Sequence, residues 1–284
     1  MTDSLLNKAS HLAVPLGLYT AAGVVAVAQA AGQQPRALWL VGLGFAFCTG
    51  TGAYLLDRVK LRDAWADPPD RRAHPARAAF IGRHRHAVRW LIVILTITGG
   101  ALGALLSWVL VAGLVAMLVG VFVYAGRPRG RRARPKDVLL AKNAFVAVGI
   151  TGLASATAWS IAGGLGAWRG AALAIGHVFV RVLADSVLCD LDDAAADGAF
   201  GTETIATRFG AAGAWAVSDG LRLVMGVVML LVPWGAWWPR MAWGVATIVS
   251  TLGLRTIRPK RVRDWVDLRL PLEAAVVAAV LVFV

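Results

Sequence analysis

The stretch DSVLCDLDDAAADGAFGTETIATRFG, residues 185–210, carries five aspartates directly after a long apolar segment. Acidic residues are scarce in this chain, which has a formal net charge of +13 and is 58% hydrophobic. A tight cluster of like charges costs free energy by mutual repulsion unless a cation is bound close by. The stretch therefore predicts a membrane helix that ends in a cation-binding site.

The composition of the whole chain indicates an integral membrane protein. The 284 residues have a mean hydropathy of +0.66, and only 16% of them are charged. Several apolar runs are long enough to span a bilayer, where backbone amides must find hydrogen-bond partners within their own segment. The alternating strands of a membrane barrel are absent from the sequence. We therefore predict an all-α integral membrane protein, in which Cys48 and Cys189 form neither a disulfide framework nor a zinc site.

Apolar runs between charged or Pro/Gly-rich breaks predict a bundle of about nine transmembrane helices. Their expected ranges are residues 12–31, 36–57, 87–107, 109–126, 138–163, 167–189, 211–233, 236–255 and 265–284. Three of the connecting segments are rich in Arg and Lys, the densest being GRPRGRRARPK at residues 126–136. The positive-inside rule places these segments in the cytoplasm, with the N-terminus inside and the C-terminus outside.

The expected organisation is one transmembrane helical domain, residues 1–284, in the inner membrane of a bacterium. Its expected cytoplasmic loops are at residues 58–86, 127–137, 190–210 and 256–264. Basic residues in such loops set the topology and contact membrane lipids, and no nucleic-acid-binding motif accompanies them. The sequence therefore predicts no nucleic-acid partner and a site that faces the cytoplasm.

Three of the clustered aspartates share one face of a helix. Asp190, Asp193 and Asp197 are spaced i, i+3, i+7, whereas Asp185 and Asp192 point roughly the other way. Hard oxygen ligands in such a row suit Mg²⁺, which often bridges protein carboxylates to substrate phosphates. The alternative is a solvated helix end whose carboxylates face nearby arginines.

A ligand for this site would be anionic at one end and apolar at the other. The acidic cluster stands at a membrane boundary, on the same side as loops dense in arginine and next to helices that enclose an apolar interior. A prenyl diphosphate has this shape. The arginines can equally serve as topology anchors that bind anionic lipids.

The segment CDLDDAAADGAFGTETIATRFG resembles the second aspartate-rich motif of the UbiA superfamily of intramembrane prenyltransferases, DxxDxxxD followed by Gly, Thr and a small-residue end. Asp190, Asp193 and Asp197 take the acidic positions, and Gly201 and Thr204 follow in order. The resemblance implies nine helices and cytoplasmic acidic loops after the second and sixth. The family's Tyr, basic run and KN pair, before and at the start of the fifth helix, are similar to Tyr124, residues 127–134, and Lys142 with Asn143.

The first acidic motif of the family, NDxxDxxxD, is incomplete in this chain. The corresponding segment reads GAYLLDRVKLRDAWADPPD, residues 52–70. One register retains Asp57 but puts Ala53 at the Asn position and Leu61 at the last Asp. The other register uses Asp63 and Asp67 but leaves Val59 at the Asn position. We favour Asp57 as the retained ligand, with Asp63, Asp67 and Asp70 as substitutes from the loop.

The resemblance implies a Mg²⁺-dependent transfer of a polyprenyl group from its diphosphate to a lipophilic or aromatic acceptor. Asp190, Asp193 and Asp197 would hold Mg²⁺ on one side of the diphosphate and Asp57 on the other, with Asp63 and Asp67 as further metal ligands. The expected diphosphate contacts are Arg58, Tyr124, Arg127, Lys142 and Asn143. Tyr124 can instead be an interfacial anchor at a helix end.

Three other functions remain open. A UbiA-type terpene cyclase would act on a prenyl diphosphate alone, and a non-catalytic relative would bind lipid without chemistry. A transporter is disfavoured because the ionisable residues gather at one face of the membrane. His177 and Arg181 form an intramembrane ionisable pair, which indicates either function or packing against a neighbouring helix.

Overall fold

The computed structural model describes residues 5–34, 37–59, 68–125, 138–257, 259 and 262–282. Every regular element within these residues is a helix. In chain order they are α1 (Leu5–His11), α2 (Val14–Ala30), α3 (Leu38–Val59), α4 (Pro68–Ala73), α5 (Pro75–Arg83), α6 (Arg85–Leu106), α7 (Trp108–Ala125), α8 (Ala141–Ala162), α9 (Trp168–Ala199), α10 (Ile205–Leu231), α11 (Trp237–Ile257) and α12 (Val262–Val282). The all-α prediction is confirmed.

Each expected span overlaps one of the longer helices, α2, α3 and α6 to α12. Five of them, α3, α6, α8, α9 and α10, are long and apolar enough to cross a membrane by length and composition. α2 and α7 are apolar but have shorter apolar stretches. α12 carries Asp267, Arg269 and Glu273, and each of the three side chains is at most 7% exposed. Charged residues of this helix are therefore turned toward the protein interior.

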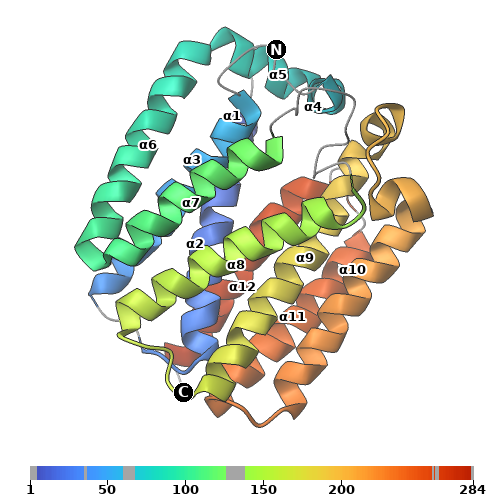
Figure 1. Cartoon of the computed structure of the whole chain (residues 1–284). Helices are drawn as coiled ribbons and strands as arrows, with labels where there is room; N and C mark the ends of the chain where they lie inside the picture. Colours follow the sequence, from blue (N-terminus) through green and yellow to red (C-terminus); the bar gives the residue numbers. More distant parts are fainter. Residues whose placement is uncertain are drawn as a thin grey trace.

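The long helices run side by side, and the two termini lie at opposite ends of the bundle (Figure 1). α2 is the central helix, since it contacts α3, α8, α9, α11 and α12. Its small buried residues, including Ala26 and Ala28, belong to the largest apolar core. The short helices α4 and α5 lie at the same end as the N-terminus (Figure 1). They fall within residues 58–86, which the sequence placed in a loop, and His74 separates them.

α9 is longer than the sequence suggested. The expected span ended at residue 189, but α9 continues through the acidic stretch to Ala199. Its 32 residues extend over about 48 Å, which exceeds the hydrocarbon core of about 30 Å. Hydropathy marks where the apolar surface ends, but intrahelical hydrogen bonds do not need apolar side chains. The segment beyond Cys189 is therefore a helix that projects from the span, in place of a loop over residues 190–210.

α10 begins six residues before its expected start at residue 211. Thr204 caps it, because its side-chain oxygen accepts from the backbone amide of Thr207 while the Thr207 hydroxyl accepts from the amide of Thr204. Gly210 then interrupts the helix with φ 69° and ψ −176°, a conformation that side chains with a Cβ rarely adopt. The connection after the acidic helix is thus reduced to residues 200–204.

Candidate active site

A cavity of about 590 Å³ opens beside the acidic end of α9. It is lined by residues of α2 to α9 and α12. Among the described residues its charged lining consists of six carboxylates and six cationic groups: Asp57, Asp185, Asp190, Asp193, Asp197, Asp267, Arg58, Arg71, Arg77, Arg85, Lys142 and Arg263. The uncharged lining includes the apolar residues Leu16, Ile81, Met117, Val121, Phe145, Val146, Ile150, Val182 and Val266. A polar end and an apolar body are thus joined in one cavity.

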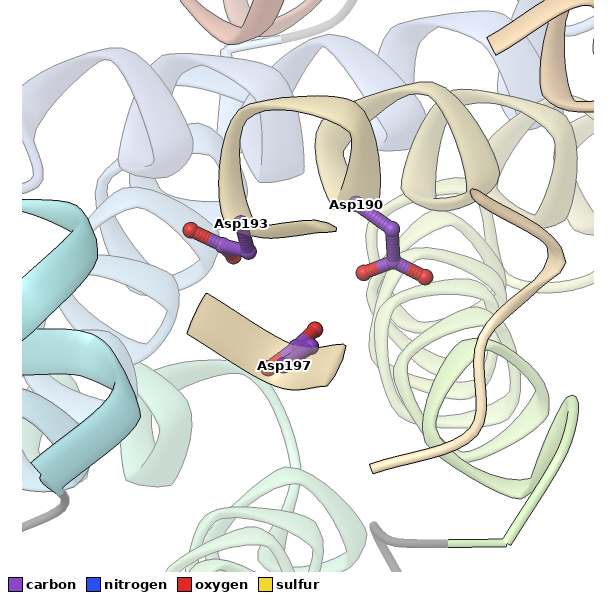
Figure 2. Close-up of side chains that lie close together, drawn as sticks. All are labelled: Asp190, Asp193 and Asp197. Carbon is purple, nitrogen blue, oxygen red and sulfur yellow. The ribbon is translucent and has the colours of Figure 1, made fainter. Parts of the chain in front are cut away.

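The predicted triad is assembled at the polar end. Asp190, Asp193 and Asp197 are 1%, 9% and 7% exposed, and one ligand oxygen of each lies within 4.8 Å of the others. Figure 2 shows the three side chains close together on the last turns of α9. Three buried carboxylates this close repel one another strongly, so their stability depends on cationic partners.

Two neighbouring residues at the start of α8 meet the triad. The Lys142 ammonium lies 2.7 Å from Asp190, 3.6 Å from Asp197 and 3.9 Å from Asp193. The Asn143 amide donates to the second Asp190 oxygen at 3.0 Å and to the Ser186 hydroxyl at 3.0 Å. The KN pair that the sequence singled out therefore contacts the acidic motif directly.

Asp193 has two further partners that the sequence did not indicate. His74, between α4 and α5, lies with its Nε2 atom 2.7 Å from Asp193 Oδ1. Arg263, in the first turn of α12, donates to Asp193 Oδ2 at 2.6 Å and lies 2.9 Å from His74 Nε2. Burial alone would raise the pKa of Asp193, but Arg263, His74 and Lys142 hold that pKa well below its ordinary value. This carboxylate, beyond the span, is therefore ionised at neutral pH.

Asp57, the residue favoured as the retained ligand of the first motif, lies at the same cavity. Asp57 and Arg58, at the end of α3, both line it. Arg58 also donates to the backbone carbonyls of Ser10 and His11 at 2.8 Å and 3.2 Å, which ties α3 to the end of α1. Among the described residues, the group of three or more possible ligands close enough to share one metal ion is the α9 triad, which does not include Asp57.

Four of the predicted site residues lie outside the residues whose side chains are described. Asp63, Asp67 and Arg127 fall in undescribed segments, and the Tyr124 side chain at the end of α7 is also undescribed. The substitute Asp70 belongs to α4, and its side chain is likewise undescribed.

The two aspartates that point away from the triad have structural partners. Asp192 accepts from the backbone amides of Val262 and Arg263 at 3.4 Å and 3.0 Å and so caps α12. Asp185 accepts from the Tyr19 hydroxyl at 2.7 Å and from Arg222 at 2.9 Å. Asp185 thereby joins a buried network.

This network extends along α9, away from the triad. Its charged members are Arg181, Asp185, Arg222, Arg269 and Glu273, each at most 5% exposed. Arg222 pairs with Asp185 and Glu273, both at 2.9 Å, while Arg181 pairs with Glu273 and Arg269 with Asp185. Arg181 precedes Asp193 by roughly 18 Å of helix. Ionisable residues thus also lie well inside the bundle, contrary to the expectation that weighed against a transporter.

His177 belongs to the packing of this region. Its Nε2 atom lies 3.0 Å from the Thr247 hydroxyl, and its ring meets Trp243 edge-on. Arg181 donates to the same hydroxyl at 3.1 Å and lies over the Trp243 ring. Of the two readings of the His177–Arg181 pair, the contacts favour packing against α11.

The donor set of the triad fits a hard divalent cation. Three carboxylates whose oxygens lie within 4.8 Å of one another match the oxygen ligands that Mg²⁺ prefers. The site also opens on a cavity, which leaves room for water or phosphate oxygens as further ligands. Mg²⁺ is therefore compatible with these residues.

Neither a protein-family model nor a curated protein matches the sequence at a significant level. Solved structures do resemble the fold. A UbiA homologue from Aeropyrum pernix K1 aligns with a TM-score of 0.68 and 13% identity, over 95% of this chain and 98% of that chain. A UbiA homologue from Archaeoglobus fulgidus bound to DMAPP and Mg²⁺ aligns with a TM-score of 0.58 and 13% identity, over 95% of this chain and 99% of that chain.

A digeranylgeranylglyceryl phosphate synthase gives a TM-score of 0.54 and 12% identity, over 95% of this chain and 96% of that chain. The agreement extends over nearly the whole length of each structure, at identities where only the arrangement of helices is shared. With its apolar helices, the chain is a multi-pass integral membrane protein. It has the fold of the UbiA superfamily.

Proposed function

We propose that this protein is a Mg²⁺-dependent intramembrane prenyltransferase, which moves a polyprenyl group from its diphosphate to a lipophilic or aromatic acceptor. The observation that carries the proposal is the buried triad Asp190, Asp193 and Asp197 at one end of a cavity with an apolar body. The fold, shared with a UbiA homologue bound to DMAPP and Mg²⁺, supports the same reading.

The charge balance of the cavity favours a divalent cation as cofactor. Its six carboxylates and six cationic side chains cancel formally among the described residues. A diphosphate would add several negative charges to this neutral lining. Mg²⁺, when bound, supplies the positive charge that stabilises the diphosphate as it leaves. Asp190, Asp193 and Asp197 would hold the ion, with Asp57 as a ligand across the cavity.

The side chains around the triad would bind and orient the diphosphate. Lys142, Arg58 and Arg263 line the cavity with Arg71, Arg77 and Arg85, and each can donate to phosphate oxygens. Asn143 holds the orientation of Asp190. Tyr124 and Arg127 remain proposed diphosphate contacts, and Asp63 and Asp67 remain proposed metal ligands.

The apolar body would hold the prenyl chain and exclude water. Ile150 lies roughly 12 Å along α8 from Lys142, and Val182 roughly 17 Å along α9 from Asp193, so the cavity continues from the charged end into the bundle. An allylic cation formed there is protected from hydrolysis until the acceptor attacks. We further propose that the site faces the cytoplasm of a bacterial inner membrane.

Inorganic diphosphate release tests the proposal. The detergent-purified protein is incubated with Mg²⁺ and geranyl, farnesyl or geranylgeranyl diphosphate, each with and without a membrane-lipid extract as the source of acceptor. A transferase releases diphosphate only when the extract is present, and EDTA stops the release. Mass spectrometry of the extract then identifies the prenylated product.

The other outcomes assign the rival functions. Release from a donor alone indicates a terpene cyclase, whose product is a cyclised hydrocarbon or alcohol. No release from any donor, with Mg²⁺-dependent binding of farnesyl thiolodiphosphate intact, indicates a non-catalytic prenyl-diphosphate-binding protein. Absence of both binding and release contradicts the proposed donor class.

A further inference from the structure

Asp267, on α12, is a cavity carboxylate that the proposed diphosphate site does not use. It is 7% exposed and lines the cavity. Within the described part of the chain its carboxylate has no hydrogen bond and no ion pair. By contrast, Asp185, Asp190 and Asp193 are ion-paired, as is Asp197. A buried charge without a paired donor is costly, so a role toward a ligand is the physical reason to keep one here.

The position of Asp267 relates it to the reacting carbon. It follows Arg263 by four residues, so it lies on the same face of α12, roughly 6 Å further along the helix axis. Arg263 binds Asp193 of the triad, and α12 runs from that end of the bundle toward the C-terminus at the other end (Figure 1). Because the allylic carbon is bonded directly to the diphosphate, a carboxylate one turn beyond the phosphate site faces the place where the acceptor must attack.

Tyr54 gives the same part of the cavity a second polar group. It lies on α3, one turn before Asp57 and Arg58, and also lines the cavity. Its hydroxyl has no hydrogen-bond partner among the described residues, and it interacts electrostatically with Asp267. Two polar groups from different helices thus face the cavity without protein partners, which is the arrangement expected around the polar group of a ligand.

The charged groups that interact with Asp267 come from three helices. They are Arg263 and Asp264 on α12, Arg58 on α3 and Asp185 on α9. Two arginines and two carboxylates thus surround it, and the neighbouring titratable groups are Tyr54 and Cys189. Arg263 and Arg58 interact with Asp267 more strongly than the two carboxylates do, which favours the ionised carboxylate that can accept a proton from a ligand.

We propose that Asp267 is the catalytic base of the transfer, and that the acceptor carries a hydroxyl group, which Tyr54 and Asp267 hold beside the allylic carbon. This inference rests on the proposed prenyltransferase function. The bond between the allylic carbon and the diphosphate oxygen breaks, and its electron pair leaves with the diphosphate. A lone pair of the acceptor oxygen forms the new carbon–oxygen bond. The hydroxyl proton passes to the Asp267 carboxylate, while the O–H electron pair stays on the acceptor oxygen.

Chemical capping of the extract tests the acceptor class. One portion of the membrane-lipid extract is treated with acetic anhydride, which blocks hydroxyl and amine groups, and another is reductively methylated, which blocks amines alone. The wild-type protein is expected to lose diphosphate release with the acetylated portion and to keep it with the methylated portion. Full release with acetylated extract would overturn the inference.

Asp267→Asn tests the base. It is expected to lower extract-dependent release by at least ~100-fold, the usual contribution of a general base, while Mg²⁺-dependent binding of farnesyl thiolodiphosphate is unchanged. Asp267→Glu is expected to recover part of the rate. The matched control is Asp264→Asn, the same change one turn earlier on the same helix and outside the cavity lining, which is expected to behave as wild type.

A pH profile separates a base from a structural residue. Wild-type release is expected to fall as the pH drops and Asp267 takes up a proton, and this acidic limb is absent from the residual rate of Asp267→Asn. The inference is overturned if Asp267→Asn matches Asp264→Asn or loses binding of the donor analogue. The proposed function survives either result, because wild-type release continues. Absence of wild-type release with every donor overturns both.

Discussion

The α9 triad brings together three carboxylates that are each at most 9% exposed. Lys142 offsets part of this charge because its ammonium contacts all three carboxylates, and Arg263 and His74 offset more at Asp193. Asp190 also holds Asn143 and Asp193 also holds α12, so substitution of either would change helix packing as well as the acidic site. The triad is therefore tested at Asp197, which pairs with Lys142.

Asp197→Asn is expected to weaken Mg²⁺-dependent binding of farnesyl thiolodiphosphate by on the order of tenfold or more, equivalent to about 1.4 kcal/mol, because one charged ligand is lost. Isothermal titration calorimetry measures the affinity for farnesyl thiolodiphosphate with Mg²⁺ present and after EDTA treatment. Asp192→Asn is the matched control, because it lies on the same helix outside the cavity and Asn caps a helix as well as Asp. Unchanged affinity in Asp197→Asn would contradict the assignment of the triad.

At the scale of helices, α9 connects the site to the core. Its outer end carries the triad, and its inner part joins α2, α10 and α12 through the buried network of Arg181, Asp185, Arg222, Arg269 and Glu273. Arg222, on α10, is the central member, since it also donates to Ser250 and Thr251 on α11. Without Arg222, Asp185 keeps Arg269 and Glu273 keeps Arg181, but the charged donor that joins these two buried pairs is lost.

Arg222→Gln is therefore expected to lower the free energy of unfolding by about 1.5–3 kcal/mol, because Asp185 and Glu273 lose a shared charged donor. Denaturant titration of the protein in mild detergent measures the change. Arg169→Gln, at an exposed position over the rings of Trp168 and Trp234, is the control and should cost about 1 kcal/mol or less. Equal effects of the two substitutions would show that the buried network contributes no special stability.

The start of α10 depends on one backbone conformation. Gly210→Ala is expected to destabilise the protein by about 1–3 kcal/mol, because φ 69° and ψ −176° are nearly restricted to glycine. An added Cβ at Gly210 would meet no atom within 4 Å, so the cost comes from the backbone alone. Gly220→Ala, in the regular part of α10 and equally unobstructed, should be neutral or stabilise by up to about 1 kcal/mol. The same unfolding titration compares the two variants. An unchanged free energy of unfolding in Gly210→Ala would contradict the left-handed backbone conformation at Gly210.

At the scale of the whole molecule, the described residues at the two ends of the bundle differ in their number of Arg and Lys side chains. The cavity, with its arginines, lies at the end where α3 stops and α12 begins, while the connection between α10 and α11 lies at the other end (Figure 1). An end rich in Lys and Arg is retained in the cytoplasm. The site should therefore be reached from the cytoplasm.

Cysteine labelling in whole cells checks this orientation. In a background carrying Cys48→Ala and Cys189→Ala, Trp234→Cys should react with a membrane-impermeant maleimide added to spheroplasts, because the residue is 38% exposed in the α10–α11 connection. His84→Cys, at the exposed junction of α5 and α6, should react only after permeabilisation. The reverse pattern would contradict a cytoplasmic site.

The spacing of Asp190, Asp193 and Asp197 was sufficient to predict one acidic face, because a helical period relates residues of a single segment. The resemblance to a family singled out Lys142 and Asn143 as diphosphate contacts, and the structure alone shows that they contact the triad. His74 and Arg263 could not be found in this way, since they lie 119 and 70 residues from Asp193. A basic loop in the sequence indicates which side of the membrane it occupies, but not which arginine reaches an aspartate.

By itself the sequence determined the all-helical membrane class, the approximate ranges of the long helices and the acidic face of α9, because burial in lipid and helical periodicity act within one segment. Only the tertiary structure decided how far α9 continues, which helices pack around α2, and which polar groups from different helices meet. Asp185 with Arg269, and Asp267 with Tyr54, belong to pairs of helices that are not consecutive in the chain. Pairings of this kind depend on how helix surfaces fit together, and no local pattern of residues encodes that fit.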